Sequence, residues 1–280
     1  MATRTHRYAS RRTRASGNTT RQSAGGALAL LGRAGFLARG LMYIVIGWIA
    51  LQIAFGNTKQ QADRTGALHE LSSTPFGEVA LWILVVGFIG MTLWQLSEAI
   101  WPTGEGRKAS KRVMALAKAV LYAVIAYGVL KYALGAGAPQ SSNKQSVDLT
   151  ATLMQHTGGK VLVVVIGLVL IGAGLYLGYQ AWRERFLKDM DLGRLSPRAR
   201  KVVEWLGRVG GVARGIVFIT AGIFLVVAAV DAKPQQAKGI DSSLRALATT
   251  PAGPWLLVLV ALGLIMFGLF SCCEARWRRF

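Results

Sequence analysis

Six long runs of apolar residues, separated by shorter polar segments, dominate the pattern along this chain. A helix needs about 20 largely apolar residues to cross a hydrocarbon core roughly 30 Å thick, and each run approaches that length. One such run could be a buried helix of a soluble protein, but six in succession predict an all-α membrane protein with six transmembrane helices. The runs are Ala38–Phe55, Val79–Ile100, Val113–Leu134, Lys160–Ala181, Val212–Val230 and Pro254–Ala275.

The chain also repeats itself. The segment LGRAGFLARGLMYIVIG at 31–47 returns as LGRVGGVARGIVFITAG at 206–222, and a weaker copy, ALAKAVLYAVIA, occupies 115–126. Each copy begins a two-helix hairpin, so three parallel copies predict a pseudo-threefold arrangement about an axis along the membrane normal. The predicted repeats cover 27–106, 107–190 and 191–280, and together they form one membrane domain.

The distribution of charge predicts the orientation of these hairpins. The chain has 33 Lys and Arg against 13 Asp and Glu, which gives a formal net charge of +20. The basic residues crowd both ends of the chain and the two loops between repeats, whereas the loops within the repeats hold few. By the positive-inside rule, this bias predicts cytoplasmic N- and C-termini. It also argues against nucleic-acid binding, which would need the charge on a folded soluble face.

The segments outside the apolar runs have patterns of their own. Residues 1–26 are polar, rich in Arg, Ser and Thr, and free of acids, which predicts a disordered basic cytoplasmic tail. The tail and the inner loops are expected to contact anionic lipid headgroups. The outer loops at 65–77, 147–159 and 240–253 each contain a capping residue, leucines on one helical face and a final glycine, which predicts three short helices on the outer surface. An interfacial segment is predicted from Lys201, before the fifth run.

One set of charged and polar residues recurs at the cytoplasmic edge of the predicted hairpins. A basic residue begins each odd-numbered span, and Glu or Gln ends each even-numbered span. Charges buried in a membrane are costly unless they are paired, so this network is interpreted as clamps that fix the hairpins, with a gate for a solute as the sharper hypothesis. The predicted pairs, each within one hairpin, are Arg39 with Glu98, Lys118 with Gln180, and Arg214 with Glu274.

Motifs for other chemistry are sparse. The chain has no H-E-x-x-H, G-x-S-x-G or P-loop sequence and no nucleophile beside a base, so we expect neither an enzyme nor a bound cofactor. His69 and His156 fall at non-equivalent positions of different outer helices, which is a poor ligand set, and no metal site is predicted. Cys272 and Cys273 are adjacent and predict no disulfide, while S-acylation of this pair stays open.

The repeated L-G-R-x-G-x-x-A-R-G-x-x-Y/F motif, the outer-loop P-x-G and the Glu-Ala hairpin ending resemble the bacterial membrane family catalogued as domain of unknown function 1206. The resemblance extends over residues 31–280. It implies two-helix repeats, usually three, and a location in the bacterial inner (plasma) membrane, and it implies no particular activity. The middle repeat departs from the motif at Gln180 and lacks a proline before Gly159, so a site with strict threefold symmetry is not expected.

This architecture leaves three hypotheses for function. The first is a channel, carrier or permeability factor for a small solute, built around the pseudo-threefold axis. The second is a non-catalytic structural or accessory protein that packs with partner helices, and the third is a lipid-acting membrane enzyme. A continuous polar axis would favour the first, a solid apolar axis the second, and clustered polar residues open sideways to lipid the third. The expected partners are the lipid bilayer and either a second copy of the chain or an unknown membrane protein.

Overall fold

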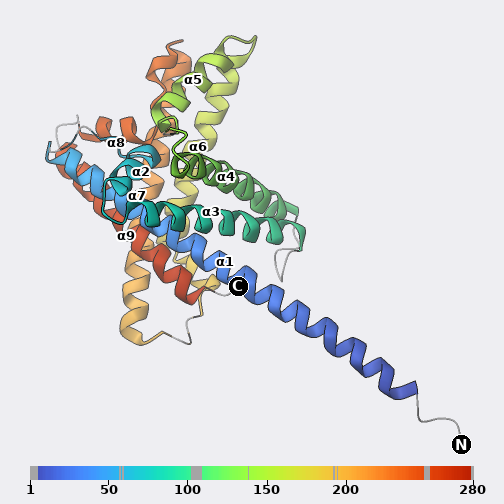
Figure 1. The fold of residues 1–280 in the computed structure, drawn as a ribbon. Coiled ribbons are helices and arrows are strands. Elements are labelled where there is room, and N and C mark those ends of the chain that lie inside the picture. Colours follow the sequence, from blue (N-terminus) through green and yellow to red (C-terminus); the bar gives the residue numbers. More distant parts are fainter. Residues whose placement is uncertain are drawn as a thin grey trace, which may run out of the picture.

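A computed structural model shows a chain built largely from helices (Figure 1). It describes residues 6–56, 58, 60–101, 109–137, 139–191, 193, 195–248 and 253–278, with side chains from residue 26 onward. Within these residues there is no strand, only an isolated bridge between Met190 and Arg278. The α-helices are α1 (His6–Ala54), α2 (Arg64–Ser72), α3 (Gly77–Ile100), α4 (Ala109–Ala133), α5 (Ser142–Met154), α6 (Gly159–Trp182), α7 (Pro197–Val230), α8 (Ile240–Ala248) and α9 (Gly253–Trp277), with 3₁₀-helices at Arg185–Asp189 and Pro234–Gln236.

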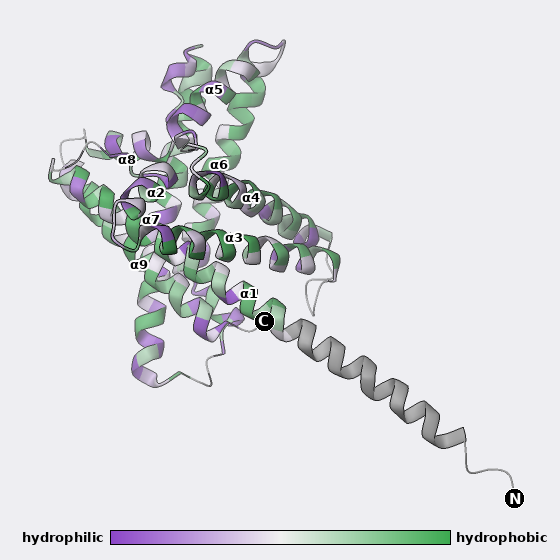
Figure 2. Cartoon of the chain, viewed as in Figure 1, coloured by the Kyte–Doolittle hydropathy of each residue, from purple (hydrophilic) through white to green (hydrophobic). Residues whose placement is uncertain are grey.

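Among the described residues, six helices are long and apolar enough to cross a membrane: α3, α4, α6, α7, α9 and the part of α1 that begins at Gly26. They contain the six predicted apolar runs to within one residue, so the prediction of an all-α protein with six candidate spans is confirmed. Figure 2 shows that these spans are largely hydrophobic. Large apolar side chains are exposed along them, for example Val120 on α4 and Val169 on α6. Such a surface is stable against lipid tails, which are as apolar as the side chains.

The structure extends two helices beyond the predictions. Helix α1 begins at His6, so residues 6–26 have a helical backbone where a disordered tail was predicted. No proline interrupts this segment, and elongating an existing helix adds one hydrogen bond per residue. The contacts predicted between the tail and lipid headgroups lie outside the described side chains. The interfacial segment predicted from Lys201 is likewise part of α7, which continues unbroken for 34 residues, about 51 Å.

The three short helices α2, α5 and α8 each connect the two spans of one repeat, as the outer-loop pattern predicts. We call the side on which they lie the short-helix side, and the opposite side, where α9 ends, the terminal side. Asp63 caps α2, because its carboxylate accepts hydrogen bonds from the backbone N–H groups of Thr65 and Gly66 at 2.9 and 3.1 Å. Ser141 caps α5 in the same manner.

Hydrogen bonds join the beginnings of these short helices into a closed circuit. Asp63 of the first repeat accepts from the backbone N–H and the hydroxyl of Ser142 in the second repeat, at 2.7 and 2.9 Å. The Ser142 hydroxyl in turn accepts from the N–H of Ile240 in the third repeat, at 3.1 Å. Asp241 closes the circuit by accepting from the N–H of Ala62 in the first repeat, at 2.7 Å. Both carboxylates are buried, so these charge-assisted bonds hold the three repeats together on this side.

The six spans are arranged as an incomplete ring. Taken in order, the packed neighbours are α4, α3, α1, α9, α7 and α6 (Figure 1). Helices α4 and α6, the two spans of the middle repeat, are not packed against each other. The buried share of a span accordingly falls from 50% in α1 and α9 to 22% in α4 and 17% in α6. The neighbours thus follow the order of a threefold ring, but the ring is open within the middle repeat. We call this opening the α4–α6 seam.

Glycines make the closest contacts between hairpins. Gly40 on α1 faces α9, where an added Cβ would lie 2.8 Å from the carbonyl oxygen of Gly268. Gly215, its equivalent in the third repeat, faces α6, where an added Cβ would lie 2.7 Å from the carbonyl oxygen of Gly174. Helix backbones can approach this closely only where side chains are absent. The glycine of the repeated Arg-Gly pair therefore packs each of these hairpins against its neighbour.

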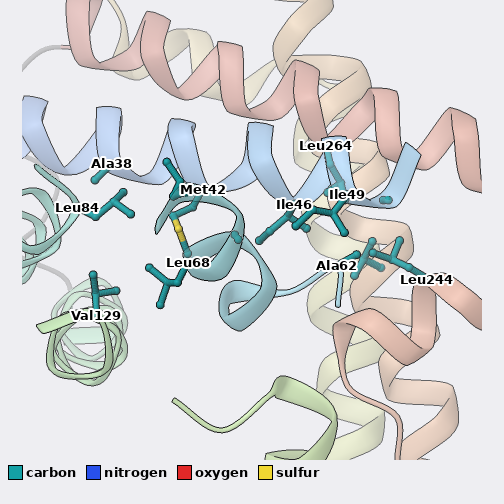
Figure 3. Close-up of a cluster of buried hydrophobic side chains, with 14 of the residues drawn as sticks. Ala38, Met42, Ile46, Ile49, Ala62, Leu68, Leu84, Val129, Leu244 and Leu264 are labelled. Carbon is teal, nitrogen blue, oxygen red and sulfur yellow. The ribbon is translucent and has the colours of Figure 1, made fainter. Parts of the chain in front are cut away.

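The largest hydrophobic cluster fills the centre of the short-helix half (Figure 3). It joins side chains of α1, α2, α3, α4, α7, α8 and α9, and Leu84 and Ile49 within it are completely buried. Met42, Leu68, Val129 and Leu244 belong to the same cluster and are labelled in Figure 3. On this side, therefore, apolar side chains occupy the space between the repeats.

Candidate functional site: a basic cluster between the repeats

Arg39 extends from α1 into the contact with α9, and its side chain is only 14% exposed. Its guanidinium forms an ion pair with Glu274, and its Nε donates a hydrogen bond to the hydroxyl of Ser271 at 3.1 Å. The guanidinium also lies 4.5 Å from the ring centroid of Phe36 and 5.3 Å from that of Phe267. Aromatic faces attract a cation that has been removed from water.

A single buried carboxylate, Glu274, serves two guanidiniums. One oxygen binds Arg39, and the other accepts a hydrogen bond from Arg278 at 2.6 Å. The second partner of Arg278 is Asp189, at 3.2 Å, whose side chain is 61% exposed. Arg278 also lies over the ring of Trp94, 5.3 Å from its centroid. Because Asp189 is largely exposed to solvent, Glu274 is the only buried carboxylate that the described residues place against these two arginines.

Arg214, which enters the bundle from α7, binds no carboxylate among the described residues. Its guanidinium lies between three aromatic rings, 5.0 Å from the centroid of Phe267, 5.5 Å from that of Phe218 and 5.9 Å from that of Tyr43. Its Nε is buried and has no hydrogen-bond partner in the described part of the chain. A buried donor without an acceptor costs about 1–3 kcal/mol, so this side chain has unused capacity to bind an anion.

Lys118 completes the set from α4, beside the seam. Its side chain is exposed in the isolated chain, and the cations that act on its charge are Arg39, Arg214 and Arg278. It forms no ion pair with any residue that the structure describes. Arg39, Lys118 and Arg214 each lie fifteen or sixteen residues before the end of their helix, about 23 Å along the axis from the short-helix side.

We call Arg39, Lys118, Arg214 and Arg278 the basic cluster. Four positive charges here face one buried negative charge, that of Glu274. Charges without partners are disfavoured in a low-dielectric interior by several kcal/mol each, so this imbalance is costly. Guanidinium and ammonium groups are the side chains that bind phosphate and carboxylate groups best. An anion in contact with the cluster would therefore remove much of this cost.

The structure brings most of the predicted network together but pairs it differently. Arg39 binds Glu274 of the third repeat, whereas the predicted partner was Glu98 of its own hairpin. Arg214 and Gln180 line a common cavity of about 90 Å³ between α6, α7 and α9, whereas Gln180 was predicted beside Lys118. The predicted pairs within hairpins are wrong because the tightest helix contacts join different repeats. The glycine contact between α1 and α9 brings Arg39 to Glu274, and the seam separates the two spans of the middle repeat.

Three members of the site were not predicted. Arg278 was counted only among the basic residues that predict the orientation of the chain. Its pairing with Glu274 could have been predicted, because side chains four residues apart meet on one face of a helix. Ser271 has no motif that sets it apart in the sequence, and its hydroxyl accepts a hydrogen bond from Arg39. Phe267 lies within a uniformly apolar run, and no signal in the sequence sets it apart.

A further cation, Arg64, lies on the short-helix side at the start of α2. Burial lowers the pKa of its guanidinium, and the neighbouring charge of Asp63 opposes that shift. Arg64 lines a second cavity, of about 220 Å³, together with Tyr127 and Lys131 of α4 and Gln140. It forms no ion pair among the described residues. Positive charge is thus present on both sides of the apolar core.

Comparisons with known proteins agree with this three-part architecture. The chain is 31% identical over 244 residues to the Uncharacterized protein YxxB of Bacillus subtilis (strain 168). The matched region covers 86% of this chain and 87% of that protein. No solved structure matches it significantly. Residues 34–102, 113–184 and 209–278 each match the family described as Domain of Unknown Function (DUF1206). The three matches each contain one of the hairpins described above, and the chain belongs to the DUF1206 family.

Proposed function

We propose that this multi-pass membrane protein binds a phosphate-bearing anion at the basic cluster, on the cytoplasmic side of a bacterial inner membrane, as an accessory protein without a chemical step of its own. The observation that carries this proposal is the charge imbalance of the cluster, where the described residues place one buried carboxylate, Glu274, and one exposed carboxylate, Asp189, against four cations. A bound anion satisfies Arg214 and Lys118, which otherwise have no ionic partner among the described residues. The cytoplasmic orientation rests on the positive-inside bias of the loops.

A binding site closed on one side fits the geometry better than a channel. An open channel needs a continuous path that ions or polar solutes can enter and leave. Here the centre of the short-helix half is filled by apolar side chains such as Leu84 and Leu68. The hydrogen-bond circuit through Asp63 and Asp241 adds a second closure on the same side. The anion therefore approaches the cluster from the terminal side or from the seam.

One observation favours a second candidate, a carrier for the same anion. The circuit that closes the short-helix side takes its bonds from all three repeats, as a gate between moving hairpins would. Arg64 on that side has no ion pair among the described residues and would attract the anion once the circuit opened. A carrier would move the anion between these two basic regions, whereas an accessory protein would only hold it.

The proposal is tested by ligand-induced thermal stabilisation of the purified protein in neutral detergent, followed by tryptophan fluorescence. The ligands are inorganic phosphate and a short-chain phosphatidic acid, each compared with chloride at equal ionic strength. A ligand that binds only the folded state stabilises it by about 2.7 kcal/mol at a hundred times its dissociation constant. We expect such stabilisation with at least one of the two ligands.

Two substitutions on α7 make a matched pair. Arg214→Gln should abolish the stabilisation by ligand and change the stability of the free protein by no more than about 1 kcal/mol, because the charge that it removes contacts aromatic rings but no carboxylate among the described residues. Arg198→Gln removes the same charge from an exposed position and should leave the response unchanged. If neither ligand stabilises the unmodified protein beyond chloride, the binding proposal fails. Uptake of labelled phosphate into vesicles, abolished by Arg214→Gln, would identify the carrier.

A further inference from the structure

We infer that the ligand of the basic cluster is an anionic phospholipid that enters sideways from the bilayer, with its headgroup phosphate on the cations and its acyl chains in the α4–α6 seam. This inference rests on the proposed anion site and adds the source and chemistry of the ligand. It draws on three features: the open side of the ring of spans, the faces of α4 and α6 beside that opening, and the position of the basic cluster along the spans.

The first side of the seam is α4. Ala119 and Ala126 are buried and pack toward α3, which fixes the rotation of the helix. At about 100° per residue, Leu121 then lies roughly opposite that contact, and Lys118 lies on the flank between them, about 100° from Ala119 and on the side of the other cations. Leu121 is 55% exposed and Met114, one turn before Lys118 on the same side, is 56% exposed. This face therefore combines one cation with an uncovered apolar surface.

The second side is α6. Gly174 and Gly167 pack against α7, which fixes the rotation of this helix in the same way. Leu177 and Gln180 lie on the flank that faces the interior, because both line the cavity that contains Arg214. Helix α6 has no packed neighbour among the spans other than α7, so the flank is covered on one side only. The cavity of Arg214 thus adjoins the open seam.

The arrangement of charge along the seam matches a phospholipid better than the other occupants. Lys118 and Arg214 lie about 23 Å from the short-helix side, near the inner boundary of a core roughly 30 Å thick. An acyl chain of the inner leaflet spans half of that core, about 15 Å, and so fits between the cluster and the short-helix side. A second copy of the chain would cover the apolar faces but leave the cations unpaired. Free phosphate would pair the cations but leave the apolar faces uncovered.

The test is photocrosslinking of lipid from within the seam. The full-length protein is reconstituted in vesicles of phosphatidylglycerol and phosphatidylcholine in equal amounts, with the substitution Leu121→benzoylphenylalanine. The matched control is Leu116→benzoylphenylalanine, about 7.5 Å nearer the terminal side and about 140° away around α4, where the side chain is 49% exposed. The crosslinked lipids are identified by mass spectrometry, and the ratio of phosphatidylglycerol to phosphatidylcholine is measured at each position.

We expect phosphatidylglycerol to be enriched on the order of thirtyfold at position 121 and not at position 116, because two unpaired cations near an anionic headgroup each contribute about 1 kcal/mol. Adding Arg214→Gln should lower the enrichment about fivefold. Equal ratios at the two positions would overturn the lipid inference. If phosphate still stabilised the protein in that case, the anion site itself would stand. Crosslinks at position 121 to a second copy of the chain would show that protein covers the seam, and would also overturn the inference.

Discussion

Removing the negative charge of Glu274 should destabilise the protein more than any other single charge change in the spans. The substitution Glu274→Gln keeps the size of the side chain but leaves Arg39 and Arg278 without their shared carboxylate. The three side chains are 8%, 14% and 22% exposed, so water cannot replace the lost partner. Breaking a buried ion pair by removing one partner costs about 3–5 kcal/mol. At roughly 2–4 °C per kcal/mol for a chain of this size, the melting temperature should fall by about 6 °C or more.

The measurement is thermal unfolding in detergent, followed by tryptophan fluorescence and by the monodispersity of the protein after heating. The control is Glu204→Gln, because the pair of Glu204 with Arg200 lies on one face of α7 with the arginine 52% exposed. Exposed i,i+4 pairs contribute about 0.5 kcal/mol or less, so this variant should melt close to the unmodified protein. Equal melting temperatures for the two variants would refute the central role of Glu274.

A double substitution separates the ion pair from other effects of the change. Arg39→Gln in the Glu274→Gln background removes the guanidinium that has lost its carboxylate partner, so the double variant should be more stable than Glu274→Gln alone. The proposed anion site predicts a further effect of this substitution on ligand binding. Glu274→Gln leaves Arg39 without a carboxylate and Arg278 with the exposed Asp189 alone, so phosphate or a short-chain phosphatidic acid should stabilise this variant more than the unmodified protein. A smaller stabilisation would mean that the anion binds elsewhere.

Two more predictions concern the packing and the orientation of the spans. Gly215→Ala should lower the free energy of unfolding by about 1–3 kcal/mol, because the new Cβ would lie 2.7 Å from the carbonyl oxygen of Gly174. Gly172→Ala should be tolerated, because the space around Gly172 is open. Equal effects of the two substitutions on thermal unfolding would contradict the role of the glycine contacts. In a Cys272→Ala, Cys273→Ala background, Thr58→Cys on the short-helix side should react with a membrane-impermeant maleimide added to intact cells, and Ser196→Cys should react only after lysis. The reverse pattern would overturn the proposed cytoplasmic termini.

The spans could be predicted from the sequence because each is determined locally. About 20 apolar residues in a row are sufficient to specify a membrane helix, whatever the rest of the chain does. The short helices were predicted from the local spacing of leucines and the final glycines, but α2 and α5 begin before the predicted segments, at the caps Asp63 and Ser141, which were not predicted. Local signals of this kind are present in the residues themselves.

The partner of Arg39 could not be predicted in the same way. Glu98 and Glu274 are equivalent positions of two repeats, so the sequence presents two matched candidates for one arginine. The choice depends on which helices approach most closely, and Gly40 faces α9 rather than the terminal half of its own hairpin. The opening between α4 and α6 could not be predicted from the sequence either. The middle repeat differs from the others at Gln180 and Ala119, but those differences do not specify that α4 and α6 separate.

The pairing of the first span with the last one has a consequence for how the protein is made. Arg39 and Glu274 are 235 residues apart, and α1 packs most extensively on α9. At roughly 5–20 residues per second, the ribosome needs about 10 to 50 s to reach the carboxylate after the arginine has emerged. During that interval the first helix must remain in the membrane with an unneutralised guanidinium. An arginine near the end of a span can reach the interface and its lipid phosphates, so we expect the ion pair with Glu274 to form only after the last span has been inserted.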